Sequence, residues 1–329
     1  MSELTVTITT TGRPDFLRTA LQSVQNQVCL TEVGEVVVSE NNNDRRTEGV
    51  LREFPDLPVR YLFRQPTLPM LAHLFSTFRQ ARTPYVAILN DDDWWSAGHV
   101  AQGLRALKAD TEATAYASAS LFVVDEAHKN PRWIDRSFAI WLLAGKPTWL
   151  STWTLEPQRM LALCWVYTPF HWSSLITRTD DLLSVLDELE HETYHTHTID
   201  RLVFARLSLR GAFRYNPVPD TFVRWHAGNW IKTPAAEGVR EIVRSTVAVV
   251  ERMATDLGWN VVAMWKNALS AMPAEVELEI LERFHEAFTP DELDRLGLAA
   301  FFRRRPPSLR LTALHNIAAN TKRLVLGCP

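Results

Sequence analysis

The sequence predicts an α/β fold with a doubly wound, mainly parallel sheet. Strand-like and helix-like patterns alternate through the first third of the chain, as in sheets whose strands are joined by crossover helices. Three polar clusters, at residues 9–13, 39–44 and 90–93, directly follow predicted strands. Ligands of such sheets bind beyond the carboxyl ends of the strands. We therefore expect the three clusters to share one crevice.

The first strand and helix are clear in the sequence. Residues 4–9 alternate apolar and polar side chains and include β-branched residues, which is typical of a strand. A turn is expected at Gly12, and Pro14 suits the first position of a helix. Phe16 and Leu21 belong to an apolar series with helical spacing after it.

The remaining elements are assigned from the same two periodicities. Further strands are predicted at residues 35–38, 58–63, 85–89, 113–121 and 173–177. Further helices are predicted at residues 45–53, 69–81, 97–108, 179–190 and 200–210, the last ended by Gly211. Residues 126–172 are rich in tryptophan and read as irregular. Residues 236–297 read as helical, with no strand pattern.

Composition excludes several classes of protein. The chain has 329 residues, 46% of them hydrophobic and 22% charged, which suits a large globular core and not a disordered chain or coiled coil. A net charge of −3 gives no sign of a nucleic-acid partner. No apolar run approaches the roughly 20 residues of a membrane span. Three scattered cysteines and no recognisable signal peptide predict a cytoplasmic protein.

The strongest chemical signal is the acidic triplet Asp91, Asp92 and Asp93, directly after the strand at 85–89. Adjacent carboxylates repel one another and are costly to bury unless a cation neutralises them. Mg²⁺ and Mn²⁺ prefer oxygen ligands and bridge to phosphates. The triplet therefore predicts a divalent-cation site. The alternative is a solvated acidic turn that caps the helix beginning near Ser96.

Several segments, in this order along the chain, resemble motifs of family 2 glycosyltransferases of the GT-A fold. The segments are Ile8-Thr-Thr-Thr-Gly-Arg-Pro, Leu21-Gln-Ser-Val-Gln-Asn-Gln, Val38-Ser-Glu-Asn-Asn-Asn-Asp, Leu89-Asn-Asp-Asp-Asp, Trp172-Ser-Ser-Leu-Ile-Thr-Arg, Asp200-Arg-Leu-Val-Phe-Ala-Arg-Leu and Val218-Pro-Asp-Thr-Phe-Val-Arg-Trp-His. The resemblance covers about residues 4–230. Each motif is loose, but their order is fairly specific.

The resemblance implies a metal-dependent, inverting glycosyltransferase. Such an enzyme moves a single sugar from a nucleotide-diphosphate sugar to a hydroxyl acceptor, which can be a saccharide, a lipid-linked saccharide or a small molecule. Mn²⁺ or Mg²⁺ would bind Asp91, Asp92 and Asp93, with His226 as a further ligand. Asp200 matches the position of the general base. Its ordinary alternative role is a helix cap.

The resemblance also assigns residues to the two substrates. The donor nucleotide sugar would contact residues of all three strand tips, namely Thr9, Thr10, Arg13, Glu40, Asp44, Asn90 and Asp91. The acceptor side would include Trp172, Ser173 and His197. Two departures from the family pattern stand out: Ile199 replaces a glutamate beside the base, and Thr221 replaces the glutamine of a motif found in processive polysaccharide synthases.

We expect two domains. Residues 1–232 would form the GT-A-like catalytic domain, with a donor half at about 1–125 and an acceptor half at about 126–232. Residues 233–329 would form a helical extension. The last 30 residues are basic and carry an apolar stripe at helical spacing. This stripe would either contact an anionic membrane surface near a lipid-linked acceptor, or pack on the domain or on a second copy of the chain.

Three other functions are considered. A nucleotidyltransferase could use a similar sheet and acidic motif, and a non-catalytic protein could bind the donor without turnover. His191-Glu-Thr-Tyr-His matches the HExxH signature, in which His191 and His195 on one helix face would bind zinc and Glu192 would act as base. Three threonines at 193, 196 and 198 disfavour a helix there. A plain surface loop is the preferred interpretation of this segment.

Overall fold

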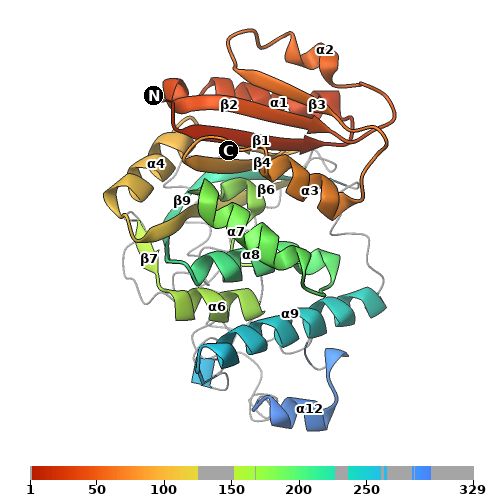
Figure 1. Ribbon diagram of the computed structural model, residues 1–329, viewed down its shortest axis with the longest axis vertical. Coiled ribbons are helices and arrows are strands. Elements are labelled where there is room, and N and C mark those ends of the chain that lie inside the picture. Colours follow the sequence, from red (N-terminus) through yellow and green to blue (C-terminus); the bar gives the residue numbers. More distant parts are fainter. Residues whose placement is uncertain are drawn as a thin grey trace.

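The computed structural model describes residues 2–124, 152–166, 168–226, 236–260, 263–264, 284 and 286–297. The strands among these residues are β1 (Leu4–Thr10), β2 (Val33–Glu40), β3 (Val59–Phe63), β4 (Tyr85–Asn90), β5 (Trp94–Trp95), β6 (Ala113–Val124), β7 (Trp153–Leu155), β8 (Ile176–Arg178) and β9 (Ala212–Trp225). They form one sheet in the order β3-β2-β1-β4-β8-β6-β9-β5, and β7 pairs with β9. Figure 1 shows the sheet in the upper part of the molecule.

Helices flank the sheet and continue below it in Figure 1. The α-helices are α1 (Pro14–Gln25), α2 (Glu48–Leu51), α3 (Met70–Phe78), α4 (His99–Ala109), α6 (Pro157–Val166), α7 (Thr179–Glu190), α8 (Ile199–Ser208), α9 (Ala236–Asp256) and α12 (Pro290–Arg295). Short 3₁₀ helices are η1 (Leu30–Glu32), η2 (Trp172–Ser174) and η3 (Thr196–Thr198). The order of strands and helices up to β6 agrees with the prediction, except that the short elements η1 and β5 were not predicted.

The sheet is mixed but mostly parallel, which confirms the predicted fold class. Strands β3, β2, β1 and β4 are parallel neighbours, whereas β8 runs antiparallel between β4 and β6. The register pairs Thr10 with Glu40 and Thr9 with Asn90. The carboxyl ends of β1, β2 and β4 therefore lie together at one edge of the sheet, where the sequence placed its three polar clusters.

Buried hydrophobic residues form one cluster on each face of the sheet. In β4, Ala87 and Leu89 belong to the cluster that includes α1 and α4. The alternate residues Val86 and Ile88 belong to the cluster that includes α3, α6, α7, α8 and α9. This alternation follows from the two-residue period of a strand, and it shows that β4 is covered on both faces.

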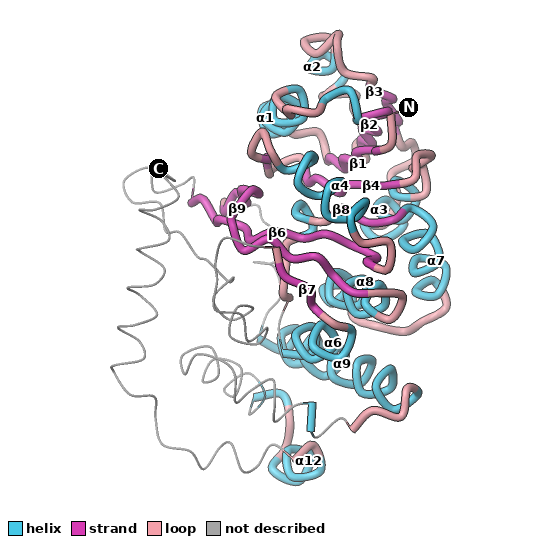
Figure 2. The backbone as a smooth tube through the Cα atoms, turned by 90° about the vertical axis from the view of Figure 1, so that its left-hand side faces the viewer, coloured by secondary structure: helices cyan, strands magenta, loops and turns pink. Residues whose placement is uncertain are grey.

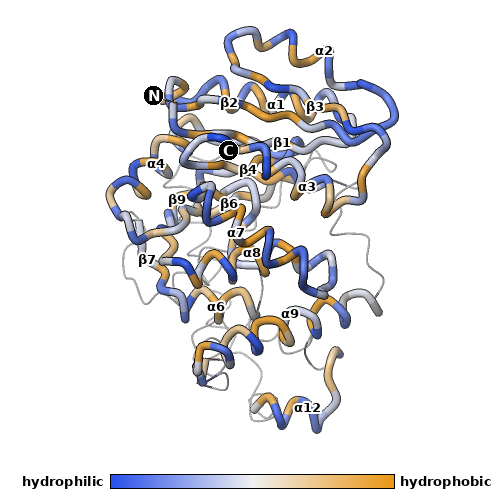
Figure 3. Tube along the Cα trace, viewed as in Figure 1, coloured by the Kyte–Doolittle hydropathy of each residue, from blue (hydrophilic) through white to orange (hydrophobic). Residues whose placement is uncertain are grey.

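The second cluster extends beyond the sheet into a layered helical region. Helix α6 contacts α8 and α9, and α8 contacts α9. Figure 2, turned by 90°, shows α6 and α9 side by side. In Figure 3, hydrophobic and hydrophilic residues alternate along these helices, as expected for amphipathic helices that share a core.

Two regions differ from the sequence prediction. Residues 152–166, expected to be irregular, contain β7 and α6, and Met160, Leu161, Leu163 and Cys164 of α6 are fully buried. The predicted Trp-rich segment also includes residues 126–151 and 167, which lie outside the described residues. Strand β9 is long although it contains two prolines. The register shift between Ser118 and Ser120 of β6 shows that the prolines occupy a bulge, where proline is tolerated.

The described part of the C-terminal region is helical, as predicted. It contains α9 and α12, and the described residues between 236 and 297 include no strand. A capping box fixes the start of α12, because Thr289 and Glu292 bond each other's backbone N–H groups. The basic tail at 300–329 lies outside the described residues, and the proposed domain boundary stays a prediction. No helix in the described ranges has the length and apolarity needed to cross a membrane.

Candidate functional site

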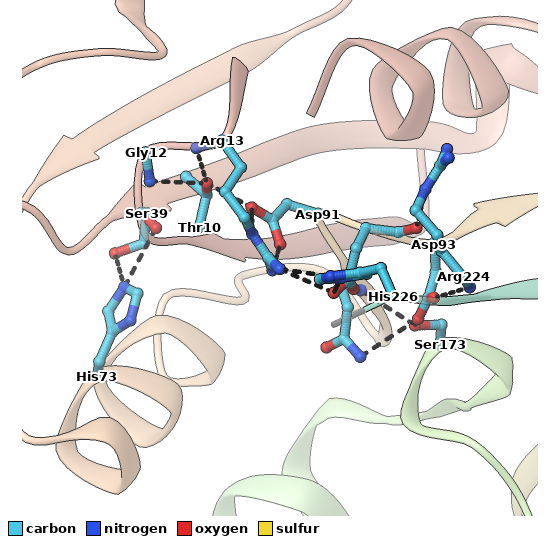
Figure 4. Close-up of polar contacts among 12 residues, drawn as sticks. Thr10, Gly12, Arg13, Ser39, His73, Asp91, Asp93, Ser173, Arg224 and His226 are labelled. Carbon is cyan, nitrogen blue, oxygen red and sulfur yellow. Dashed lines mark hydrogen bonds and ion pairs between the residues drawn. The ribbon is translucent and has the colours of Figure 1, made fainter. Parts of the chain in front are cut away.

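A tight turn after β1 aims Arg13 across the edge of the sheet. The hydroxyl of Thr10 accepts the backbone N–H groups of Gly12 and Arg13, at 3.2 and 3.4 Å, and donates to the Asp91 carboxylate at 2.5 Å (Figure 4). Gly12 has a φ of +88°, which favours glycine, and a Cβ there would lie 2.2 Å from the Asn42 amide nitrogen. The turn and the acidic motif are thus one hydrogen-bonded unit.

The Arg13 guanidinium bridges two carboxylates of the triplet. Its Nε donates to Asp91 Oδ2 at 3.1 Å, its Nη2 also donates to Asp91, and its Nη1 donates to Asp92 Oδ2 at 2.9 Å. The Asp91 and Asp92 side chains are 1% and 11% exposed, whereas Arg13 is 32% exposed. Charge-assisted bidentate contacts of this kind are among the stronger hydrogen bonds in proteins.

His226, directly after β9, completes this group. Its Nε2 lies 3.1 Å from Asp92 Oδ2 and 3.5 Å from Arg13 Nη1. The ring centroids of His226 and Phe16 are 4.9 Å apart, which places α1 against the same imidazole. The three segments that meet here are separated by more than 70 residues each, so only the sheet topology brings them together (Figure 4).

Asp93 is turned away from the other two aspartates. It accepts a hydrogen bond from Ser173 Oγ at 2.5 Å, one from the Arg224 backbone N–H at 3.1 Å and one from Asn90 Nδ2 at 3.3 Å. His171 Nδ1 lies 3.3 Å from the same carboxylate, which is 1% exposed. Asp93 therefore joins the end of β4 to η2 and to β9.

Burial is the largest influence on the pKa values of Asp91 and Asp93. It raises the pKa of Asp91 to about 6, against the opposing effect of the Arg13 guanidinium, and the neighbouring Asp92 charge adds to the rise. Burial and Asp92 also raise the pKa of Asp93 well above its usual range, although Ser173 and the Arg224 N–H oppose the shift. Burial thus disfavours the charged forms of these two carboxylates, and a bound cation would favour them.

The donor atoms fit a divalent cation in part. Asp92 Oδ2 and His226 Nε2 are adjacent, and Asp91 lies on the other side of Arg13. Carboxylate oxygens suit Mg²⁺ and Mn²⁺, and an imidazole suits Mn²⁺. Among the residues that the structure describes, however, no three His, Cys, Asp or Glu side chains gather closely enough to form a metal centre by themselves. A further ligand would have to come from the substrate.

The tip of β2 is arranged differently from the prediction that Glu40 faces the nucleotide. Glu40 is fully buried, and its carboxylate accepts hydrogen bonds from the Thr47 hydroxyl at 2.6 Å, the Tyr61 hydroxyl at 2.7 Å and the Arg46 backbone N–H at 3.0 Å. Its extra methylene relative to aspartate lets it reach back into the loop that follows β2. Asp44 is exposed on this loop and pairs with Arg46.

Three residues that the sequence analysis missed contribute to the site. Arg224 places its guanidinium between the rings of Phe16 and Trp94, at 4.8 and 5.0 Å, and its Nε donates to the Asp92 carbonyl at 3.2 Å. His171 is the neighbour of Asp93. His73 of α3 lies 3.0 Å from Ser39 Oγ at the tip of β2, and burial lowers its pKa to about 4. Only Arg224, two positions before His226, carried a recognisable signal.

The start of α8 presents Asp200. The Asp200 carboxylate accepts the Arg201 backbone N–H at 2.8 Å, within the first turn. The Arg201 side chain donates to Thr168 Oγ1 at 3.0 Å. Thr168 leads into the segment whose Ser173 holds Asp93. The first turn of α8 is therefore linked to the acidic triplet through a single short segment.

The other predicted acceptor residues have structural contacts. Trp172 packs on Phe78 and Phe204, with ring centroids 5.6 and 5.7 Å away. Ser173 is fully buried, and its hydroxyl donates a hydrogen bond to the Asp93 carboxylate. His197 lies in η3, with its ring 5.1 Å from that of His195.

The HExxH segment does not form the helix that zinc binding requires. Helix α7 ends at Glu190, and residues 192–195 are irregular. Glu192 instead accepts hydrogen bonds or ion-pair contacts from Arg206 of α8 at 3.0 Å and Arg252 of α9 at 3.2 Å. The His195 backbone N–H donates to Ser245 of α9 at 2.9 Å. This loop joins α7 and α8 to α9.

Comparison with known sequences identifies the family of the N-terminal half. The profile of glycosyl transferase family 2 matches residues 5–164, which span β1, the Arg13 turn and the acidic triplet. This part of the chain belongs to glycosyl transferase family 2. The protein is therefore a glycosyltransferase that uses a nucleotide-sugar donor, as the resemblance implied. No curated protein sequence matches the chain.

Solved structures support the fold. The Staphylococcus aureus TarS fragment 1–349 in complex with UDP-GlcNAc aligns with a TM-score of 0.52 at 13% identity, over 90% of this chain and 92% of that one. The same fragment without ligand aligns with a TM-score of 0.51 at 13% identity and the same coverage. At this identity the likeness establishes the GT-A-like fold of this family 2 enzyme and nothing finer.

Proposed function

We propose that this family 2 enzyme is metal-dependent and inverting, and that it transfers a single sugar from a nucleoside-diphosphate sugar to a hydroxyl acceptor. The observation that carries the proposal is the meeting of Arg13, Asp91, Asp92 and His226 at the carboxyl ends of β1, β4 and β9. A diphosphate needs positive charge at this position of the sheet, and the carboxylates need a cation.

The cation, Mn²⁺ or Mg²⁺, would be held by Asp92 and His226, with Asp91 beside them and the donor diphosphate supplying further oxygens. When bound, it neutralises charge that develops on the leaving diphosphate. Thr9, Thr10, Arg13 and Asn90 line the strand tips that would face the nucleotide. Glu40 would act on the nucleotide site through the loop that it holds, which also carries Asp44.

Asp200 would act as the general base. Its carboxylate takes the proton of the acceptor hydroxyl while the acceptor oxygen bonds to the anomeric carbon. The bond from that carbon to the diphosphate breaks on the opposite face, so that the configuration inverts and a nucleoside diphosphate leaves. The link from Arg201 through Thr168 to the Ser173 segment supports this assignment. Trp172 and His197 would border the acceptor without taking part in proton transfer.

Donor binding is the first test. UDP-GlcNAc is the first donor to try, because the TarS fragment of similar fold binds it. Thermal unfolding should shift upward with UDP or UDP-GlcNAc in the presence of Mn²⁺ and much less with EDTA, since a ligand that binds only the folded state stabilises it. Equal shifts with and without metal would contradict metal dependence.

Product analysis is the second test. With a saccharide acceptor, the enzyme should release a nucleoside diphosphate and form a glycoside whose anomeric configuration, measured by NMR, is opposite to that of the donor. Retention would contradict the direct displacement. Release of pyrophosphate would identify the alternative nucleotidyl transfer.

A further inference from the structure

Arg13 occupies the space between the two carboxylates that the proposed function assigns to a divalent cation. Its three donor nitrogens contact Asp91 and Asp92 from within the acidic pair. His226, the third residue assigned to the cation, lies 3.5 Å from the same guanidinium. A cation bound to Asp92 and His226 would therefore lie next to, or in place of, the Arg13 charge.

The acidic pair depends on this guanidinium when no other cation is bound. Two nearly buried carboxylates on adjacent residues repel each other and lose solvation. Arg224 is the other described arginine near this pair. Its Nε donates a hydrogen bond to the Asp92 carbonyl, and its guanidinium lies over the rings of Phe16 and Trp94. The Asp91 and Asp92 carboxylates thus receive their described arginine contacts from Arg13.

The Arg13 side chain is also more exposed than those of Asp91, Asp92 and His226. Its side chain is 32% exposed, and its backbone lies in a turn just before α1. Its guanidinium also lies 5.4 Å from the centroid of the Phe16 ring. A diphosphate offers pairs of oxygens that can accept bidentate hydrogen bonds from a guanidinium, as the carboxylates do.

We propose that Arg13 is an internal counter-cation that blocks metal binding in the free enzyme and passes to the donor diphosphate when metal and donor bind together. The proposal rests on the metal-dependent function proposed above. A divalent cation and a diphosphate diester carry about +2 and −2, so they enter together without changing the net charge of the site. A metal ion that bound without the diphosphate would be repelled by the positive charge of Arg13. Arg13 thereby couples metal affinity to the presence of nucleotide.

Direct metal-binding measurements test this coupling. Mn²⁺ affinity is measured by electron paramagnetic resonance and by calorimetry, without nucleotide and with saturating UDP. The proteins are the wild type, Arg13→Met, Arg13→Lys and the control Arg18→Met, whose arginine pairs with Glu53 and Asp15 on the surface of α1. We expect UDP to raise the Mn²⁺ affinity of the wild type and of Arg18→Met about tenfold or more.

The Arg13 variants should lose this dependence. Arg13→Met should bind Mn²⁺ alone about tenfold more tightly than the wild type, with little further gain from UDP. Its metal-free melting temperature should fall, and Mn²⁺ alone should restore it. If Arg13→Met does not fold, Arg13→Lys decides, because an ammonium keeps the charge but cannot reproduce the bidentate contact with Asp91. Lysine should raise the affinity for Mn²⁺ alone several-fold.

Two results would overturn the proposal in distinguishable ways. If the wild type binds Mn²⁺ with UDP and neither Arg13 variant binds Mn²⁺ alone more tightly, the role of Arg13 is wrong and the metal-dependent function stands. If no protein binds Mn²⁺ even with UDP, both are wrong.

Discussion

The donor and acceptor sides of the candidate site are built in different ways. On the donor side, side chains from β1, β4 and the end of β9 contact one another directly, with Arg13 between Asp91 and Asp92. On the acceptor side, the charged residues contact supporting helices, and Glu192 joins Arg206 of α8 to Arg252 of α9. The proposed donor side concentrates charged side chains at the strand ends, whereas the charged residues of the proposed acceptor side join helices to one another.

The comparison shows that a short motif does not determine its own chemistry. Both the acidic triplet and the HExxH segment resemble metal-binding signatures in the sequence. The triplet ends a buried parallel strand, where topology brings Arg13 and His226 to it. The HExxH segment follows the end of α7, where topology brings two arginines to its glutamate. The side chains that the fold places beside each motif therefore decide its chemistry.

The largest effect is expected at the acceptor side. Asp200→Asn should lower kcat by about 10²–10⁴-fold, because the amide cannot take the acceptor proton. UDP binding in the presence of Mn²⁺ should be unchanged. Initial rates and calorimetry separate the two effects, and Asp187→Asn, an exposed aspartate of α7 that pairs with Arg79, is the matched control. A normal kcat in Asp200→Asn would show that Asp200 is not the general base.

At the donor side, Asp92→Asn should impair both binding and turnover. Loss of the carboxylate that contacts Arg13 and His226 should lower kcat/KM by about 10²–10³-fold. It should also abolish the Mn²⁺-dependent part of UDP binding, which Asp200→Asn retains. Asp15→Asn, an exposed aspartate of α1, should behave as the wild type. Identical phenotypes in Asp92→Asn and Asp200→Asn would erase the distinction between the two sides.

The sequence predicted the donor side better than the acceptor side, for physical reasons. Strand β1 alternates apolar and polar residues, β4 is apolar, and both are followed by polar clusters, so the edge that joins Thr10 to Asp91 could be derived from periodicity and topology. The pairing of Arg13 with both aspartates could not, because it depends on the positive φ of Gly12 and on how the turn aims the side chain. The orientation of the buried Asp93 side chain could not be derived either, because its partner Ser173 is 80 residues away.

The acceptor half was harder to predict because its signals conflict. Helix α6 was hidden in a Trp-rich stretch, although its buried Leu161 and Cys164 have helical spacing. Strand β9 contains Pro217 and Pro219, which argue against a continuous strand unless a bulge accommodates them. Asp200 was identified by resemblance and not by any pattern of its own. The sequence could show that α9 is a helix, but not that the His-rich loop packs on it.

A buried histidine on the donor side should make the stability of the protein sensitive to acid. His73 under the tip of β2 has a pKa of about 4 when folded, so the unfolded chain binds its proton more readily between about pH 4 and 6.5. Stability from this group is complete above that window and is lost as the pH falls through it. From about pH 7.5 to 4.5 the loss amounts to about 2–3 kcal/mol. Comparing the urea unfolding of the wild type with that of His73→Gln isolates the contribution of His73 to stability. The carboxylates titrate in both proteins, so their effect cancels. An equal acid response in the two proteins would contradict it.

The smallest expected effect concerns the acceptor scaffold and tests the opposite side of the comparison. Glu192→Ala should lower the free energy of unfolding by about 2 kcal/mol, because Arg206 and Arg252 lose a shared, mostly buried carboxylate. Glu190→Ala, which breaks an exposed pair with Arg79, should cost less than about 1 kcal/mol. Sugar transfer per folded molecule should be retained in both variants, and neither should change the zinc content. A zinc site would respond in the reverse way, since its general base would be lost while the fold stayed intact. Loss of turnover without loss of stability in Glu192→Ala would therefore assign chemistry, and not support, to this loop.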